Sequence, residues 1–76
     1  MTQKELLNKI KEMKLAREFA LISFTNQKDI FFQYFGSTHL PLDQFIAFNF
    51  EIMNIEKIIK VQQSPLNPDC VIVEVA

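Results

Sequence analysis

The chain has 76 residues, of which 49% are hydrophobic, with eight Phe, one Gly and a net charge of −1. This length fits a single domain over residues 1–76, and the hydrophobic content excludes an intrinsically disordered chain. One cysteine (Cys70) and one histidine (His39) exclude an internal disulfide and a structural zinc site with four nitrogen or sulfur ligands. We expect a cytoplasmic protein with no membrane partner, because no apolar run reaches the ~18–20 residues of a membrane span and the N-terminus lacks the apolar centre of a signal peptide.

Charge is unevenly distributed along the chain. Residues 1–17 hold five basic and two acidic residues, a net charge of +3, whereas the rest of the chain holds three basic and seven acidic residues, a net charge of −4. Nucleic-acid-binding proteins usually have a strong basic excess. Any basic surface of this protein is therefore confined to its first segment.

That first segment is predicted to be an amphipathic helix over residues 2–16. Thr2 and Glu5 have the spacing of a capping box, in which each side chain accepts a hydrogen bond from the other residue's backbone amide. Leu6, Ile10 and Met13 then recur at helical spacing, so they form one apolar stripe. We expect the helix to end near residues 14–18 and to pack on a sheet.

A β-hairpin is predicted next, with arms over 19–25 and 29–35 joined by a loop of three to five residues. Its second arm is apolar on both faces. Ile30, Phe32 and Tyr34 share one face, and Phe31 and Phe35 lie on the other. A strand of this kind must be covered on both faces, and one helix covers only one.

Residues 42–57 fit two patterns. Alternation of Ile46, Phe48, Phe50 and Ile52 with smaller or polar residues favours a strand over 45–52 after a short turn. The alternative is a second helix at about 41–53, with Pro41 at its start. We favour the strand.

The last predicted element is a hairpin with strands over 58–63 and 70–75, joined by a turn rich in Pro, Asn and Asp. Ile59 and Val61 are expected to face inward, and Val71, Val73 and Val75 to share one face. The predicted fold is α+β, with the N-terminal amphipathic helix packed on a mostly antiparallel sheet of four to five strands.

No motif indicates an enzyme, a cofactor or a metal site. His39, with Ser37 and Asp43 nearby in the sequence, suggests a hydrolytic site only in outline, because no nucleophile-elbow motif surrounds Ser37. Cys70 begins a valine-rich strand, where a free cysteine is typically a small buried hydrophobe. We expect a protein that is not an enzyme.

The function that the sequence favours is non-catalytic binding of another protein or of a second copy of itself, as a small regulatory module. Large exposed apolar patches mark interaction sites, and the candidate residues are Phe31, Tyr34 and Phe35 on the doubly apolar strand. The alternative is nucleic-acid binding by the basic first helix, with Lys4, Lys11 and Lys14 as contacts.

Overall fold

The computed structural model describes the whole chain except residues 14, 16–19 and 27. The described residues form two helices and four strands in the order α-β-β-α-β-β. Their bounds are α1 (Gln3–Glu12), β1 (Leu21–Thr25), β2 (Ile30–Tyr34), α2 (Leu42–Ile52), β3 (Ile58–Gln63) and β4 (Cys70–Val75).

The four strands form one sheet in the order β2-β1-β4-β3. The two hairpins, β1/β2 and β3/β4, are antiparallel, and they join through a parallel pairing of β1 with β4. The predicted α+β class and mostly antiparallel sheet are therefore confirmed, and the sheet is mixed because of its central pairing. The parallel pairing places the outer strands of the two hairpins, β2 and β3, at the edges.

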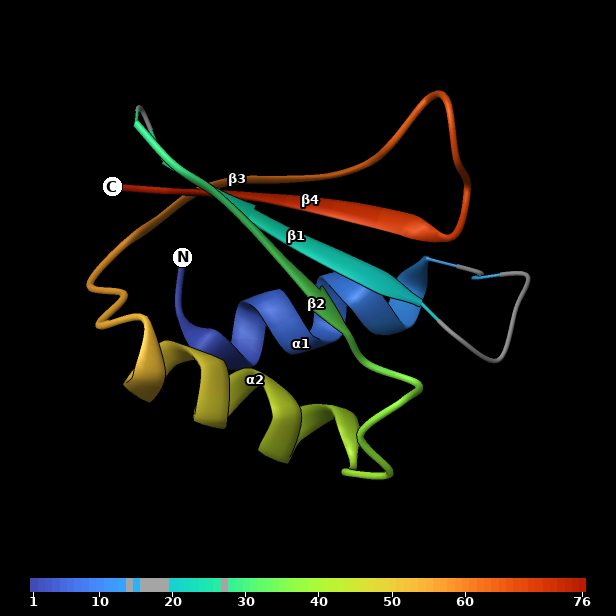
Figure 1. Ribbon diagram of the computed structural model, residues 1–76, viewed down its shortest axis with the longest axis horizontal. Helices are drawn as coiled ribbons and strands as arrows, with labels where there is room; N and C mark the ends of the chain where they lie inside the picture. Colours follow the sequence, from blue (N-terminus) through green and yellow to red (C-terminus); the bar gives the residue numbers. More distant parts are fainter. Residues whose placement is uncertain (14, 16–19, 27) are drawn as a thin grey trace.

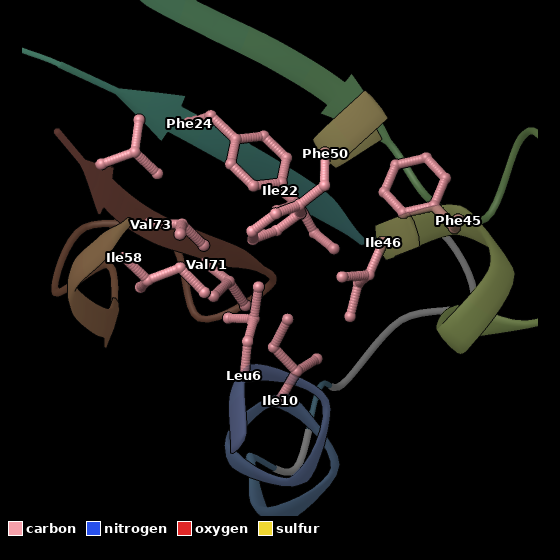
Figure 2. Close-up of a cluster of buried hydrophobic side chains, with 11 residues drawn as sticks. Leu6, Ile10, Ile22, Phe24, Phe45, Ile46, Phe50, Ile58, Val71 and Val73 are labelled. Carbon is pink, nitrogen blue, oxygen red and sulfur yellow. The ribbon is translucent and has the colours of Figure 1, made fainter. Parts of the chain in front are cut away.

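Both helices lie on the same side of the sheet (Figure 1). The core lies between the helices and the sheet, where side chains of β1 and β4 meet those of α1 and α2 (Figure 2). It is built from buried aliphatic and aromatic residues: Leu6, Ile10, Ile22, Phe24, Phe45, Ile46, Phe50, Ile58, Val71, Val73 and Val75.

Helix α1 begins as predicted. The Thr2 hydroxyl accepts a hydrogen bond from the Glu5 amide (3.2 Å), and the Glu5 carboxylate accepts one from the Thr2 amide (3.1 Å). The predicted stripe is also confirmed, since Leu6 and Ile10 are buried. The helix ends at Glu12, earlier than expected, because Met13 adopts an extended backbone conformation. Most of the range predicted for its end, residues 14–18, lies outside the described residues.

Residues 45–52 are helical, so the strand that we favoured there is wrong and the alternative helix is right. The buried residues of α2 are Phe45, Ile46, Asn49 and Phe50, which recur at helical spacing. The alternation that suggested a strand came from Phe48 and Ile52, which are exposed in the structure. Buried Asn49 fits the helix because its side-chain amide donates to the Phe45 carbonyl (2.8 Å).

Particular residues explain where α2 begins and ends. Pro41 occupies the N-cap position, where its missing amide proton costs the helix nothing. At the other end Asn54 has φ 56°, in the left-handed region. The Asn54 amide donates to the Glu51 carbonyl (3.3 Å) and the Ile55 amide to the Phe50 carbonyl (3.0 Å). This is the pair of hydrogen bonds of a Schellman motif, so the chain turns sharply toward β3.

The last hairpin is confirmed, with one correction. Val71, Val73 and Val75 are all buried on the helix side. Ile59 does not face inward: Ile58 is buried, Ile59 is 55% exposed, and the register shifts between Ile58 and Lys60. A bulge of this kind inserts one extra residue, so Ile58 and Val61 both face the core although they are three residues apart.

Candidate interaction surface

The two faces of β2 have different surroundings. Phe31 is paired with Phe24 in the β1/β2 register, and the Phe24 ring packs edge-on against Phe50 of α2 (6.2 Å between ring centroids). Phe35 follows β2 and packs edge-on against Phe45 (5.6 Å). Phe31 and Phe35, two of the predicted interaction residues, are thus partly buried against the core on the helix side.

The opposite face of β2 is open to solvent. Ile30 is 64% exposed and Tyr34 is 57% exposed, and both helices of the described part of the chain lie on the other side of the sheet. The division of β2 into two apolar faces is as predicted. The helices cover the face of Phe31 and Phe35, so the exposed apolar face is that of Tyr34, the third predicted residue.

The outer edge of β2 carries backbone groups that no described strand uses. The Phe35 amide donates to the Ala20 carbonyl (2.9 Å), and the Asn26 amide donates to the Asp29 carbonyl (3.0 Å). In an antiparallel ladder the residues bonded to the partner strand alternate. Phe31 and Gln33 therefore bond to β1, while the amides and carbonyls of Ile30, Phe32 and Tyr34 point away from it.

A second exposed apolar group lies on α2. Phe48 and Ile52 are 53% and 60% exposed, and they follow Phe45 at i+3 and i+7, so the three residues lie along one side of the helix. Because the Phe45 ring contacts Phe35 just after β2, this side of α2 is the one next to β2.

The opposite side of α2 faces α1. There Asp43 and Ile46 line a small hollow of about 190 Å³ together with Gln3, Lys4 and Leu7. Phe48 and Ile52 are therefore on the side away from α1. We use the term β2-side surface for Ile30, Tyr34, Phe48, Ile52 and the outer edge of β2.

The other edge of the sheet is protected in ways that β2 is not. Strand β3 contains Lys60 and the register shift next to it. Lysine residues and bulges on an edge strand hinder pairing with another strand. Strand β2, with the sequence Ile-Phe-Phe-Gln-Tyr, has no charged residue and a regular register.

The basic residues predicted for nucleic-acid binding are only partly described. Lys4 and Lys11 are exposed and lie two turns apart on one side of α1. Lys14 lies outside the described residues. Exposed Glu5 and Glu12 occupy the same helix, so α1 presents charges of both signs.

The residues considered for hydrolytic chemistry have structural hydrogen bonds. The hydroxyls of Ser37 and Thr38 donate to the carbonyls of Tyr34 and Phe35 (3.0 and 2.8 Å), which closes the turn after β2. His39 is exposed in the next loop with φ 61°. Cys70 is buried, and this burial raises the pKa of its thiol. Within the described residues no three His, Cys, Asp or Glu side chains are grouped so that they could hold a metal ion.

Comparison with protein families, curated proteins and solved structures finds no match for this chain. Neither α1 nor α2, the helices of the described residues, combines the length and the apolar character needed to cross a membrane. Sequence reasoning missed Ile30, Phe48 and Ile52 as surface residues. Ile30 shares the face of Tyr34 in the sequence pattern, but the strand interpretation of 45–52 hid the exposure of Phe48.

Proposed function

We propose that this protein is a non-catalytic interaction module that binds a protein partner through the β2-side surface. The observation that supports this most directly is the placement of four large exposed hydrophobic side chains on both sides of an uncharged edge strand. Proteins that add a strand to such an edge gain affinity from main-chain hydrogen bonds and specificity from side chains on either face. The expected partner is therefore a protein segment that pairs with β2.

The size of this surface is compatible with a specific contact. With about 200 Å² for each large side chain, the exposed fractions of Ile30, Tyr34, Phe48 and Ile52 amount to roughly 450 Å². Burying this area contributes about 11 kcal/mol of gross stabilisation, which is similar to the ~4–15 kcal/mol that association costs. Binding therefore also needs hydrogen bonds to the outer backbone groups of β2 and apolar surface on the partner.

Proximity labelling in cells of the source organism tests the proposal. The test variant is the double substitution Tyr34→Lys and Phe48→Lys, which places a charge on each side of β2. The matched control is Ile59→Lys, at a similarly exposed isoleucine on the opposite edge. Circular dichroism checks that all three proteins are folded.

We expect the proteins labelled by the wild type to be retained by Ile59→Lys and lost from the double variant. Retention of the same partners by the double variant would refute the β2-side surface. Partners lost instead after Lys4→Glu and Lys11→Glu, together with binding to RNA or DNA that weakens steeply with salt, would establish the nucleic-acid alternative.

A further inference from the structure

Strand β2 can pair with a copy of itself. We infer that the partner of the β2-side surface is a second copy of this chain, joined antiparallel through β2 about a two-fold axis, so that the sheet continues across both copies. This inference rests on the proposed function and specifies its partner. The amides and carbonyls at Ile30, Phe32 and Tyr34, which pair with no described strand, have the alternating spacing that an antiparallel neighbour requires.

One register uses the whole strand. If the two-fold axis passes between the two Phe32 backbones, Ile30 of each copy stands opposite Tyr34 of the other, and all five residues of β2 are paired. Any shift along the strand leaves residues at its ends unpaired. The Tyr34 carbonyl already accepts from the Ser37 hydroxyl (3.0 Å), and its second lone pair remains for the new strand.

The side chains also match in this register. Ile30 and Tyr34 are each more than half exposed, and both lie on the open face. Opposed residues in an antiparallel pair have Cβ atoms ~4.5–5.5 Å apart, and aromatic residues beside β-branched ones stabilise such pairs. The two-fold axis therefore produces two Ile30–Tyr34 contacts, each covering side chains that one copy leaves in water.

Helix α2 extends the contact on the other face. It runs back along β2, since Phe45 contacts Phe35 at one end of the strand and Phe50 contacts Phe24, the register partner of Phe31, near the other. In Figure 1, β2 crosses in front of β1 with α2 below it. Phe48 and Ile52 follow Phe45 on the same side of α2 and are exposed there. In the inferred dimer the two-fold axis places this side of α2 in each copy toward the same side of the other copy.

Charge and area agree with self-association of moderate strength. Strand β2 has no charged residue, and Asp43 of α2 lies on the side that faces α1. The other charged residue of α2 is Glu51, which is exposed one turn after Phe48. The roughly 450 Å² of exposed side chain per copy falls below the ~600 Å² per partner at the low end of specific interfaces. The backbone atoms at the outer edge of β2 and the partly buried Phe31 add the remaining interface area. We expect a dimer that dissociates on dilution.

Cysteine cross-linking tests the register directly. In a Cys70→Ala background each chain carries one new thiol, either Ile30→Cys or Tyr34→Cys. Directly opposed residues of a hydrogen-bonded pair have Cα atoms ~5.5 Å apart, within the ~4.4–6.8 Å range of a disulfide. Two copies of residue 30 are about four residues apart along the strands, or ~13 Å.

The mixture of the two variants is therefore expected to form a covalent dimer, at least tenfold faster than either variant alone. Ile30→Cys mixed with Ile59→Cys is the control for random collision, because Ile59 is also more than half exposed and lies on the other edge strand. A mixture that reacts no faster than this control, or Tyr34→Cys reacting with itself as fast as the mixture, would overturn the inferred pairing.

Sedimentation equilibrium separates this inference from the proposed function. Ile30→Lys, which enters a two-fold interface twice, is expected to raise the dimer dissociation constant about 100-fold, and Ile59→Lys to leave it unchanged. Wild-type protein that remains a monomer at about 100 µM would overturn self-pairing. The proposed function would still stand if the Tyr34→Lys and Phe48→Lys double variant lost its partners in cells.

Discussion

Two phenylalanines on α2 provide a direct test of how this helix is placed. Phe45 is 1% exposed and its ring contacts Phe35, whereas Phe48, three residues later, is 53% exposed. We consider the single substitutions Phe45→Ala and Phe48→Ala. The two changes remove the same atoms from the same helix, so the difference between them reports burial and not helix propensity.

The expected magnitudes follow from these exposures. Replacing a buried Phe with Ala costs ~3–5 kcal/mol of unfolding free energy. Phe48 buries about half of its ~200 Å² of surface, so its removal costs at most ~2.4 kcal/mol of hydrophobic stabilisation. The higher helix propensity of Ala offsets about 0.5 kcal/mol of this cost. We therefore expect a cost of about 3–5 kcal/mol for Phe45→Ala and about 1–2 kcal/mol for Phe48→Ala. A domain of 76 residues has a total stability of about 4–11 kcal/mol, so the first change removes a large share.

Urea unfolding followed by circular dichroism at 222 nm measures both values. The measurement is made at low protein concentration, so that self-association does not stabilise the wild type. In a strand over 45–52 Phe48 would share a face with Phe50, and Phe45 would lie on the opposite face. Equal destabilisation by the two substitutions, or a larger loss for Phe48→Ala, would refute the helical placement of these side chains.

Two further predictions concern the helix ends. Asn54 has φ 56°, so Asn54→Gly is expected to raise the melting temperature slightly and Asn54→Ala to cost about 1 kcal/mol; an Ala variant as stable as the Gly variant would contradict the left-handed conformation. The hydrogen bond from the Thr2 amide lowers the pKa of Glu5 below its ordinary value of 4.5. The folded-state pKa is the lower one, so this stabilisation is present above pH 4.5 and is lost as the pH falls through the folded-state pKa. In melting curves at several pH values, Glu5→Gln is expected to lose less stability on acidification than the wild type, and an identical pH dependence would contradict the capping box.

The elements with a strong local signal were predictable from the sequence. The capping box of α1 depends on two residues three apart, and the hairpins depend on alternation and turn composition. Both kinds of signal act within a few residues, so no knowledge of the rest of the fold is needed to read them. The pairing of β1 with β4 is different, because it joins residues about 50 apart in the chain and no local pattern specifies it.

Helix α2 shows why residues 45–52 were misassigned. Apolar residues fill both the buried side and the side next to β2, and the exposed Phe48 and Ile52 completed an alternating pattern. Pro41 at the N-cap and Asn54 after the last turn were the better indicators, since they mark helix boundaries. The same error hid Phe48 and Ile52 as parts of the β2-side surface. In a strand over 45–52 these two residues would share one face with Ile46 and Phe50, which are buried.

The strand order explains why the exposed residues of β2 are available to a partner. Pairing β1 with β4 places β2 and β3 at the two edges, and these edges differ in kind. Strand β3 carries a lysine and a bulge, which are ordinary protections against unwanted pairing. Packing against the helices accounts for Phe31 in β2 and for Phe35 just after it, but no contact within the described chain accounts for the exposed Ile30 and Tyr34. Strand β2 is uncharged, has a regular register and is apolar on its open face, whereas the strand at the opposite edge is protected. This is the arrangement expected of a strand that pairs with a partner.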